Sequence, residues 1–195
     1  MASILKVSQL QKPDGSTPTA ADLGIDVTSG DMPAGSVIQL QSSSFGSRVS
    51  GSSGSWYDIG LSTTITPTSA SSKVYIQLNT NVCENYTNPS MGFRVIRSIN
   101  GGSWELVGVG DTQFSGQVPT MMNWSKHSME QTTPADVYPV SGAYLDSPST
   151  TSSTVYKVQI FSYAGSWYVN GNNRNNNTTF DKSQISTLTL TEIAQ

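Results

Sequence analysis

The stretch Lys73–Val82, KVYIQLNTNV, alternates apolar and polar side chains with a period of two. Its apolar positions are Val74, Ile76, Leu78 and Val82, and the polar residues Lys73, Gln77 and Asn79 occupy the opposite face. Successive side chains of a β-strand point to opposite faces of the sheet, so this spacing is typical of a half-buried strand. The stretch therefore predicts a strand with one face in an apolar core.

Similar strand-like stretches occur on both sides of this one. They are GSVIQLQ (35–41), WYDIGLSTTI (56–65), GFRVIRSI (92–99), STVYKVQIFSY (153–163) and ISTLTLTEIAQ (185–195). Turn-rich segments separate them, and Asn100-Gly101 is the strongest hairpin signal, with Asn170-Gly171 following SWYV in the same manner. We interpret the Gly/Ser-rich segment at 42–55 as a long loop. About eight short strands at this spacing predict an all-β fold, an antiparallel β-sandwich or jelly roll.

Composition excludes several classes of partner. Charged residues make up 12% of the 195 residues, the net charge is −3, and Lys and Arg form no cluster. Because basic clusters drive binding to nucleic acid and to anionic membranes, we expect neither partner. No apolar run approaches the length needed for membrane insertion, and the single cysteine, Cys83, excludes an intramolecular disulfide. We expect a protein assembled in a cytoplasm.

The first 34 residues differ in character from the rest. A short apolar run with Ile4, Leu5, Val7 and Leu10 leads into the turn-rich sequence KPDGSTP. We therefore divide the chain into an extended N-terminal arm and linker, residues 1–34, and a head domain, residues 35–195. A lone strand is not stable, so the arm either returns to the edge of its own sheet or pairs with another chain as an anchor.

No catalytic motif accompanies the titratable residues. His127 and Cys83 are the only residues of their kinds and lie in no recognisable dyad sequence. The carboxylates that could supply a glycosidase pair are Glu105, Asp111, Asp136, Asp146 and Asp181, although such scattered acids more often serve as caps and surface groups. We expect a protein that is not an enzyme and binds no cofactor or metal.

Aromatic residues flanked by polar ones are the candidate binding groups. Trp104, Trp124, Trp167 and Tyr168 are each either core or interface residues, or ligand contacts that stack on a sugar ring or a protein partner. The following segment, VNGNNRNNNTTF, predicts an exposed tip rich in amide groups. The candidate receptor contacts are Trp167, Tyr168, Asn172 and Arg174.

Two parts of the sequence carry a resemblance to a known family. The opening, ASILKVSQLQKPDG, and the β-rich stretches ITPTSASSKVYIQLN, GFRVIRSING and STLTLTEIAQ resemble the small virion proteins of marine and cyanobacterial tailed phages. The resemblance implies a fibre-tip or appendage subunit with a jelly-roll head, which assembles as a homotrimer. It carries no catalytic motif and transfers no site residues.

This resemblance sets the expected function and its alternatives. We expect a tail-fibre protein of the virion that acts in host attachment, contacts other virion proteins through its arm and binds a host-surface glycan or protein. The alternatives are a capsid decoration protein and, less favoured, a carbohydrate-active enzyme. Copy number per virion separates the first two, and depolymerase activity identifies the third.

Overall fold

The computed structural model describes residues 11–19, 32–84, 90–111, 114–125, 137–173 and 183–195. Every regular element in these residues is a β-strand, which confirms the predicted all-β class. The strands in chain order are β1 (Val37–Phe45), β2 (Val49–Ser52), β3 (Trp56–Ile65), β4 (Lys73–Glu84), β5 (Ser90–Ile99), β6 (Glu105–Val107), β7 (Met122–Ser125), β8 (Tyr138–Asp146), β9 (Thr154–Ser162), β10 (Ser166–Val169) and β11 (Ser186–Ile193).

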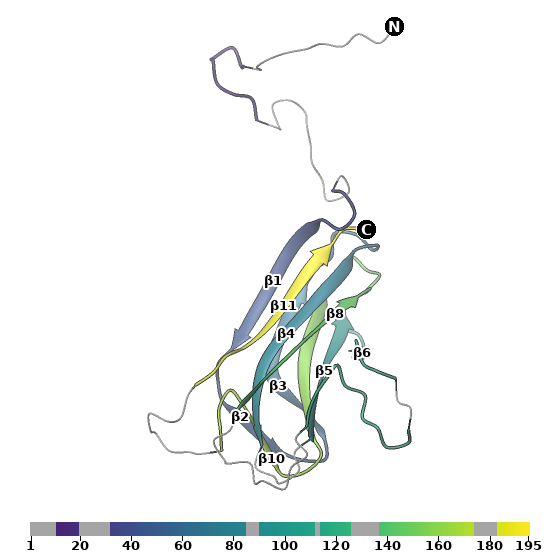
Figure 1. Ribbon diagram of the computed structural model, residues 1–195. Helices are drawn as coiled ribbons and strands as arrows, with labels where there is room; N and C mark the ends of the chain where they lie inside the picture. Colours follow the sequence, from purple (N-terminus) through teal and green to yellow (C-terminus); the bar gives the residue numbers. More distant parts are fainter. Residues whose placement is uncertain (1–10, 20–31, 85–89, 112–113, 126–136, 174–182) are drawn as a thin grey trace.

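These strands form two antiparallel sheets that pack as a sandwich (Figure 1). Sheet A contains β1, β11, β4 and β8 in that order, and β10 and β2 extend it beyond the end of β11. Sheet B has the order β3, β9, β5, and the short strands β6 and β7 both pair with β5. We count β6 and β7 as one interrupted strand and set β2 and β10 aside, which leaves eight strands. Numbered 1 to 8 along the chain, these strands have the order 1-8-3-6 in sheet A and 2-7-4-5 in sheet B. This is the strand order of a jelly roll, which confirms the prediction.

The core lies between the sheets and is built from the alternating positions. Ile76 and Leu78 of β4 are fully buried, and the register places Leu190 and Leu188 of β11 directly beside them. The opposite layer contributes a buried set from sheet B, namely Phe93, Val95, Tyr156, Val158 and Ile160. The period-two pattern of the sequence therefore identified the buried faces of the central strands.

One of the two Asn-Gly pairs forms the predicted hairpin. Asn100 and Gly101 have φ angles of 49° and 72°, and the amide of Gly102 donates to the carbonyl of Ile99 at 2.9 Å. Two successive positive φ values match the twist of the strands, here β5 and β6, that such a turn connects. The hairpin expected at Asn170-Gly171 is wrong for the described strands, because β10 pairs with β2 and β4 and not with β11.

Asn170 instead fills the junction where β10 and β11 follow one another along β4. Its side chain donates to the carbonyl of Phe45 at 2.6 Å and accepts from the amide group of Asn81 and the hydroxyl of Ser186. The backbone amide of Asn170 donates to Oδ1 of Asn81 at 2.9 Å. Because Asn170 is 2% exposed, these bonds satisfy polar groups that lie away from water at the interruption of the ladder.

The Gly/Ser-rich segment is not simply a loop. β1 continues to Phe45, and Val49–Ser52 forms β2. This strand pairs with β10, so that Trp167 lies opposite Gly51 and Val169 lies opposite Val49. The predicted loop over 42–55 is therefore wrong in part. Weak strand propensity is overridden here by pairing with a neighbouring strand, which sequence composition does not report.

The N-terminal arm and linker are described over residues 11–19 and 32–34. There, Asp14 accepts hydrogen bonds from the backbone and hydroxyl of Ser16, and the amide of Gly15 donates to Lys12, which forms the turn expected from KPDGS. The anchor residues Ile4, Leu5, Val7 and Leu10 lie outside the described residues. The division of the chain between residues 34 and 35 stays a prediction. Just before β1 begins, the amide of Gly35 donates a hydrogen bond to the carbonyl of Ala194.

Candidate functional site

The outer face of sheet B gathers aromatic and charged side chains from three strands. Antiparallel register aligns Trp56 of β3, Phe161 of β9 and Gly92 of β5 in one row, and Asp58, Gln159 and Arg94 in the next. All of these positions alternate with core residues, so they point away from the sandwich interior. The two rows are neighbours, because positions two residues apart on a strand share one face.

Hydrogen bonds and cation–aromatic contacts connect these rows. Nε of Arg94 donates to Gln159 at 2.8 Å, and its guanidinium lies 4.0 Å from the ring centroid of Trp56. Gln159 in turn donates to Asp58 at 2.6 Å. Partial burial lowers the pKa of Arg94, an effect opposed by the charge of Asp58, and the group stays a cation at neutral pH.

The face continues toward Trp104, which precedes β6. Nζ of Lys157 donates to Asp58 at 3.0 Å and lies 4.3 Å from the ring centroid of Trp104. The Trp104 side chain is nevertheless 45% exposed. These groups surround a hollow of about 410 Å³, which we call the charged hollow, lined by Asp58, Arg94, Ile96, Trp104, Leu106, Lys157 and Gln159.

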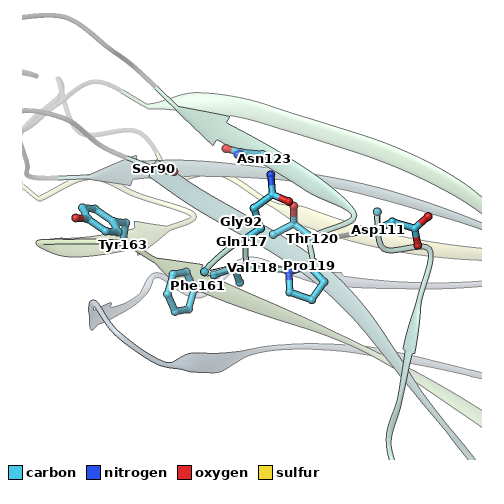
Figure 2. A pocket seen from close by; sticks show the side chains of 12 residues that line it. Ser90, Gly92, Asp111, Gln117, Val118, Pro119, Thr120, Asn123, Phe161 and Tyr163 are labelled. Carbon is cyan, nitrogen blue, oxygen red and sulfur yellow. The ribbon is translucent and has the colours of Figure 1, made fainter. Parts of the chain in front are cut away.

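A second hollow of about 400 Å³ lies at the other end of the same face. Its lining includes the connection between β6 and β7, and we call it the loop hollow. Figure 2 shows Tyr163 and Asp111 at opposite ends of this hollow, with Phe161, Gln117 and Thr120 between them.

Gly92 allows the loop to approach the sheet. A Cβ atom on Gly92 would overlap the methyl group of Thr120, so only glycine lets this part of the loop lie directly on β5. The amide of Met121 then donates to the carbonyl of Phe93 at 2.8 Å. The loop hollow therefore depends on a close contact between the loop and the sheet.

The outer face of sheet A has a different chemistry. Register aligns Leu40, Thr191, Tyr75 and Leu145 in one row across four strands. Leu40, Tyr75 and Leu145 are 58%, 40% and 44% exposed. The rest of the four-strand face is made of Ser, Thr, Gln, Asn and Ala, with Val37, Ile193 and Pro139 as further apolar members and Lys73 as a charged member among the described residues.

The predicted receptor contacts are only partly accessible. Trp167 is 2% exposed, which fits its core alternative and not a ligand contact, whereas the exposure expected for Asn172 is wrong, since its exposed fraction is 6%. The indole of Trp167 packs in the core and donates to the carbonyl of Ser52 at 3.1 Å, so its polar atom is satisfied inside the protein. Tyr168 is half-buried under the guanidinium of Arg48, which also donates to the Asn172 carbonyl, while Arg174 lies outside the described residues.

The other tryptophans of the sequence prediction lie in different settings. Trp124 is half-buried and packs against Tyr138 with ring centroids 4.5 Å apart, which fits the expected core or interface position. Trp104 faces the charged hollow. Trp56 was not singled out as a candidate, because its neighbours Arg94 and Phe161 come from distant strands.

Two of the candidate carboxylates meet at one arginine. Asp146 is 7% exposed, and its oxygens lie 2.6 Å from Nη1 of Arg97, while Glu105 lies 3.2 Å from Nη2. Tyr156 also donates to Asp146 at 2.7 Å, and burial together with this carboxylate raises the pKa of Tyr156. The ion pair between Arg97 and Asp146 links the two sheets at the edge of the core, since Asp146 belongs to sheet A and Arg97 to sheet B.

The remaining titratable candidates do not assemble with these. Asp111 lines the loop hollow, and Asp136, Asp181 and His127 lie outside the described residues. Cys83 is buried. The described part of the chain contains no cluster of three or more metal-ligating side chains, and none of it forms a helix long and apolar enough to cross a membrane.

Glu192, a carboxylate with an exposed fraction of 0%, is not among the residues predicted from the sequence. Its oxygens accept from Gln39 Nε2 at 2.7 Å, from the Thr68 amide at 2.7 Å and from the Thr68 hydroxyl at 2.8 Å. Burial raises the pKa of Glu192, but these hydrogen bonds and one from Ser72 together lower the pKa by more than burial raises it. The pKa of Glu192 therefore lies below its usual value. The available signal was its position, since Glu192 shares the core face with Leu188 and Leu190.

Comparison with protein-family models and with curated proteins finds no match. Among solved structures, the chain is similar to one in the structure of infectious bursal disease virus Gx strain, with 9% sequence identity and a TM-score of 0.39. The match covers 82% of this chain and 43% of that chain, so the present chain spans less than half of its length. We draw no functional assignment from this likeness. The structure itself defines a jelly-roll β-sandwich with two chemically different outer faces.

Proposed function

We propose that this chain is a structural protein of a phage virion, a tail-fibre or fibre-tip subunit that acts in host attachment as a homotrimer. The observation that carries the proposal is the contrast between the two outer faces. One is nearly uncharged and has an exposed apolar row, whereas the other combines aromatic rings, charges and two hollows. Such a division suits a subunit that packs against its own kind on one side and binds a target on the other.

In this proposal the outer face of sheet A is the trimer interface. Leu40, Tyr75 and Leu145 form an apolar row about 14 Å long across four strands. The low charge of this face keeps the cost of removing it from water small, because few charged groups lose their hydration. The N-terminal arm would then hold the trimer to the virion through Ile4, Leu5, Val7 and Leu10.

Oligomeric state tests the interface. The full-length protein should have a mass near three chains by light scattering, and Tyr75→Asp should give monomers with an unchanged circular-dichroism spectrum. The control is Phe114→Asp, because Phe114 is 70% exposed and lies away from this row. A wild-type monomer at micromolar concentration would contradict the trimer.

Location in the virion tests the function. Quantitative mass spectrometry of purified particles should give the low copy number of a tail component, whereas on the order of hundreds of copies would identify a shell decoration protein. Leu5→Asp combined with Val7→Asp should remove the protein from particles and leave the isolated trimer intact. Normal incorporation of this double variant would show that the arm is not the anchor.

A further inference from the structure

We propose that the charged hollow on sheet B is a binding site for an acidic glycan, with the sugar ring on Trp104 and the anionic group at Arg94 and Lys157. This inference rests on the proposed attachment function for its biological role and adds the chemical class of the receptor.

Trp104 provides an aromatic surface in the charged hollow. Trp104 is 45% exposed although it lines a hollow, and Lys157 lies over its ring at 4.3 Å. A large flat side chain is costly to leave in water, and here the contact with Lys157 holds it beside the sheet rather than in the core. An exposed indole beside hydrogen-bonding groups suits a pyranose, which has apolar C–H faces and a rim of hydroxyl groups.

Polar side chains line the same hollow as Trp104 and form hydrogen bonds with one another. Asp58 accepts from Lys157 and Gln159, and each carboxylate oxygen has room for a further donor such as a sugar hydroxyl. Gln159 accepts from Arg94, so the side chains hold one another in place before any ligand arrives. Groups fixed in this way lose little conformational entropy on binding.

The hollow contains two cations, Arg94 and Lys157, and one carboxylate, Asp58, so its local charge is positive in a chain with a net charge of −3. The Nε of Arg94 is used by Gln159, whereas its terminal Nη groups have no hydrogen bond to other described residues. A guanidinium whose terminal Nη groups are available is suited to a carboxylate or a sulfate, because the oxygens of either group match its planar pair of N–H donors.

The occupant is therefore an anionic sugar rather than a neutral one or a protein. A neutral glycan would use Trp104 and Asp58 but leave the Nη groups of Arg94 unmatched. A protein receptor of ordinary affinity buries roughly 800 Å² on each partner, a larger and flatter contact than this hollow supplies. Carboxylated and sulfated sugars share the required chemistry, and the binding experiment separates them.

Binding is measured with full-length protein by isothermal titration calorimetry against polygalacturonate, dextran sulfate and neutral dextran. We expect binding to at least one anionic polymer and at least tenfold weaker binding to dextran. Trp104→Ala and Arg94→Gln should each weaken binding about tenfold or more, whereas Phe114→Ala and Lys12→Ala, at residues that do not line the hollow, should not. Equal loss with Lys12→Ala would mean nonspecific charge attraction and would overturn the site.

The outcomes distinguish this inference from the proposed function. If all three polymers fail to bind but Trp104→Ala lowers adsorption of virions to cells, the attachment function survives and the receptor is not an acidic glycan. If the anionic polymer binds through Trp104 and Arg94 but adsorption is unchanged in these variants, the glycan site stands and attachment is contradicted. Circular dichroism and the oligomeric mass of each variant exclude misfolding as the cause.

Discussion

Replacing Glu192 by glutamine should destabilise the head in a way that depends on pH. All the groups that bond to this carboxylate are donors: the Gln39 amide, the Thr68 backbone and hydroxyl, and the Ser72 hydroxyl. A glutamine at position 192 would place its own NH₂ group against one of these donors. Gln39 cannot resolve the conflict by turning its amide, because its Nε2 also donates to the Thr66 carbonyl at 2.8 Å.

The expected magnitude follows from the bonds that change. One charge-assisted hydrogen bond is replaced by a contact between two donors, and the bonds from Thr68 become bonds between neutral groups. Since a hydrogen bond to a charged group contributes about 1.5–3 kcal/mol and a neutral one about 1 kcal/mol, Glu192→Gln should lower the free energy of unfolding by about 3 kcal/mol. For a domain of this size the midpoint of thermal unfolding should fall by about 6–12 °C.

The pH dependence gives a second, independent check. The folded-state pKa of Glu192 lies below the unfolded value of about 4.3, so the ionised carboxylate stabilises the fold above that value. This contribution is lost as the pH falls through the folded-state pKa, where wild type also becomes neutral at position 192. The stability difference between wild type and Glu192→Gln should therefore be constant above about pH 5 and shrink below about pH 4.

Urea unfolding followed by tryptophan fluorescence, repeated from pH 3 to pH 7, measures both quantities. The matched control is Glu105→Gln, because the Glu105 side chain is 60% exposed and forms a surface pair with Arg97 that should contribute less than about 1 kcal/mol. A loss below about 1 kcal/mol for Glu192→Gln, or a difference that does not change with pH, would refute the assigned role of this carboxylate.

Three further substitutions test other parts of the fold. Asp146→Ala should lower the free energy of unfolding by about 3 kcal/mol in urea titrations, since it leaves the partly buried charge of Arg97 without its main partner. Asn170→Gly keeps the positive φ of 60° available but removes the buried hydrogen bonds at the strand junction, and should cost about 2 kcal/mol in the same assay. Gly92→Ala should displace the loop at Thr120, which limited proteolysis would detect as faster cleavage between β6 and β7, with a loss of about 1–3 kcal/mol.

The parts of the fold that the sequence predicted share one property, namely that they depend on neighbours along the chain. The alternation in 73–82 identified the buried face of β4, and that in 185–195 identified the buried face of β11. Asn100-Gly101 specified its hairpin because the positive φ values are a local requirement. Short strands with turn signals between them were enough to predict an antiparallel β-sandwich or jelly roll.

The features that the sequence did not reveal depend on distant partners. β2 forms in a Gly/Ser-rich segment because β10 pairs with it more than a hundred residues later. The contact between Trp56 and Arg94 on the outer face of sheet B depends on the register of three strands, including the irregularity between Asp58 and Ser62 in β3. Trp167 and Trp104 have similar neighbours in sequence, yet one is 2% and the other 45% exposed, because tertiary packing decides the difference.

The interruption between β6 and β7 has an evolutionary consequence. The two strands together fill one edge position of the jelly roll, and of the described residues that connect them, 108–111 and 114–121, only Met121 packs against the apolar core. Insertions or exchanges before Met121 would alter the wall of the loop hollow without changing the register of β5 or the packing between the sheets. The molecule thus has a place where the shape and chemistry of its surface can change by recombination while the scaffold keeps its stability.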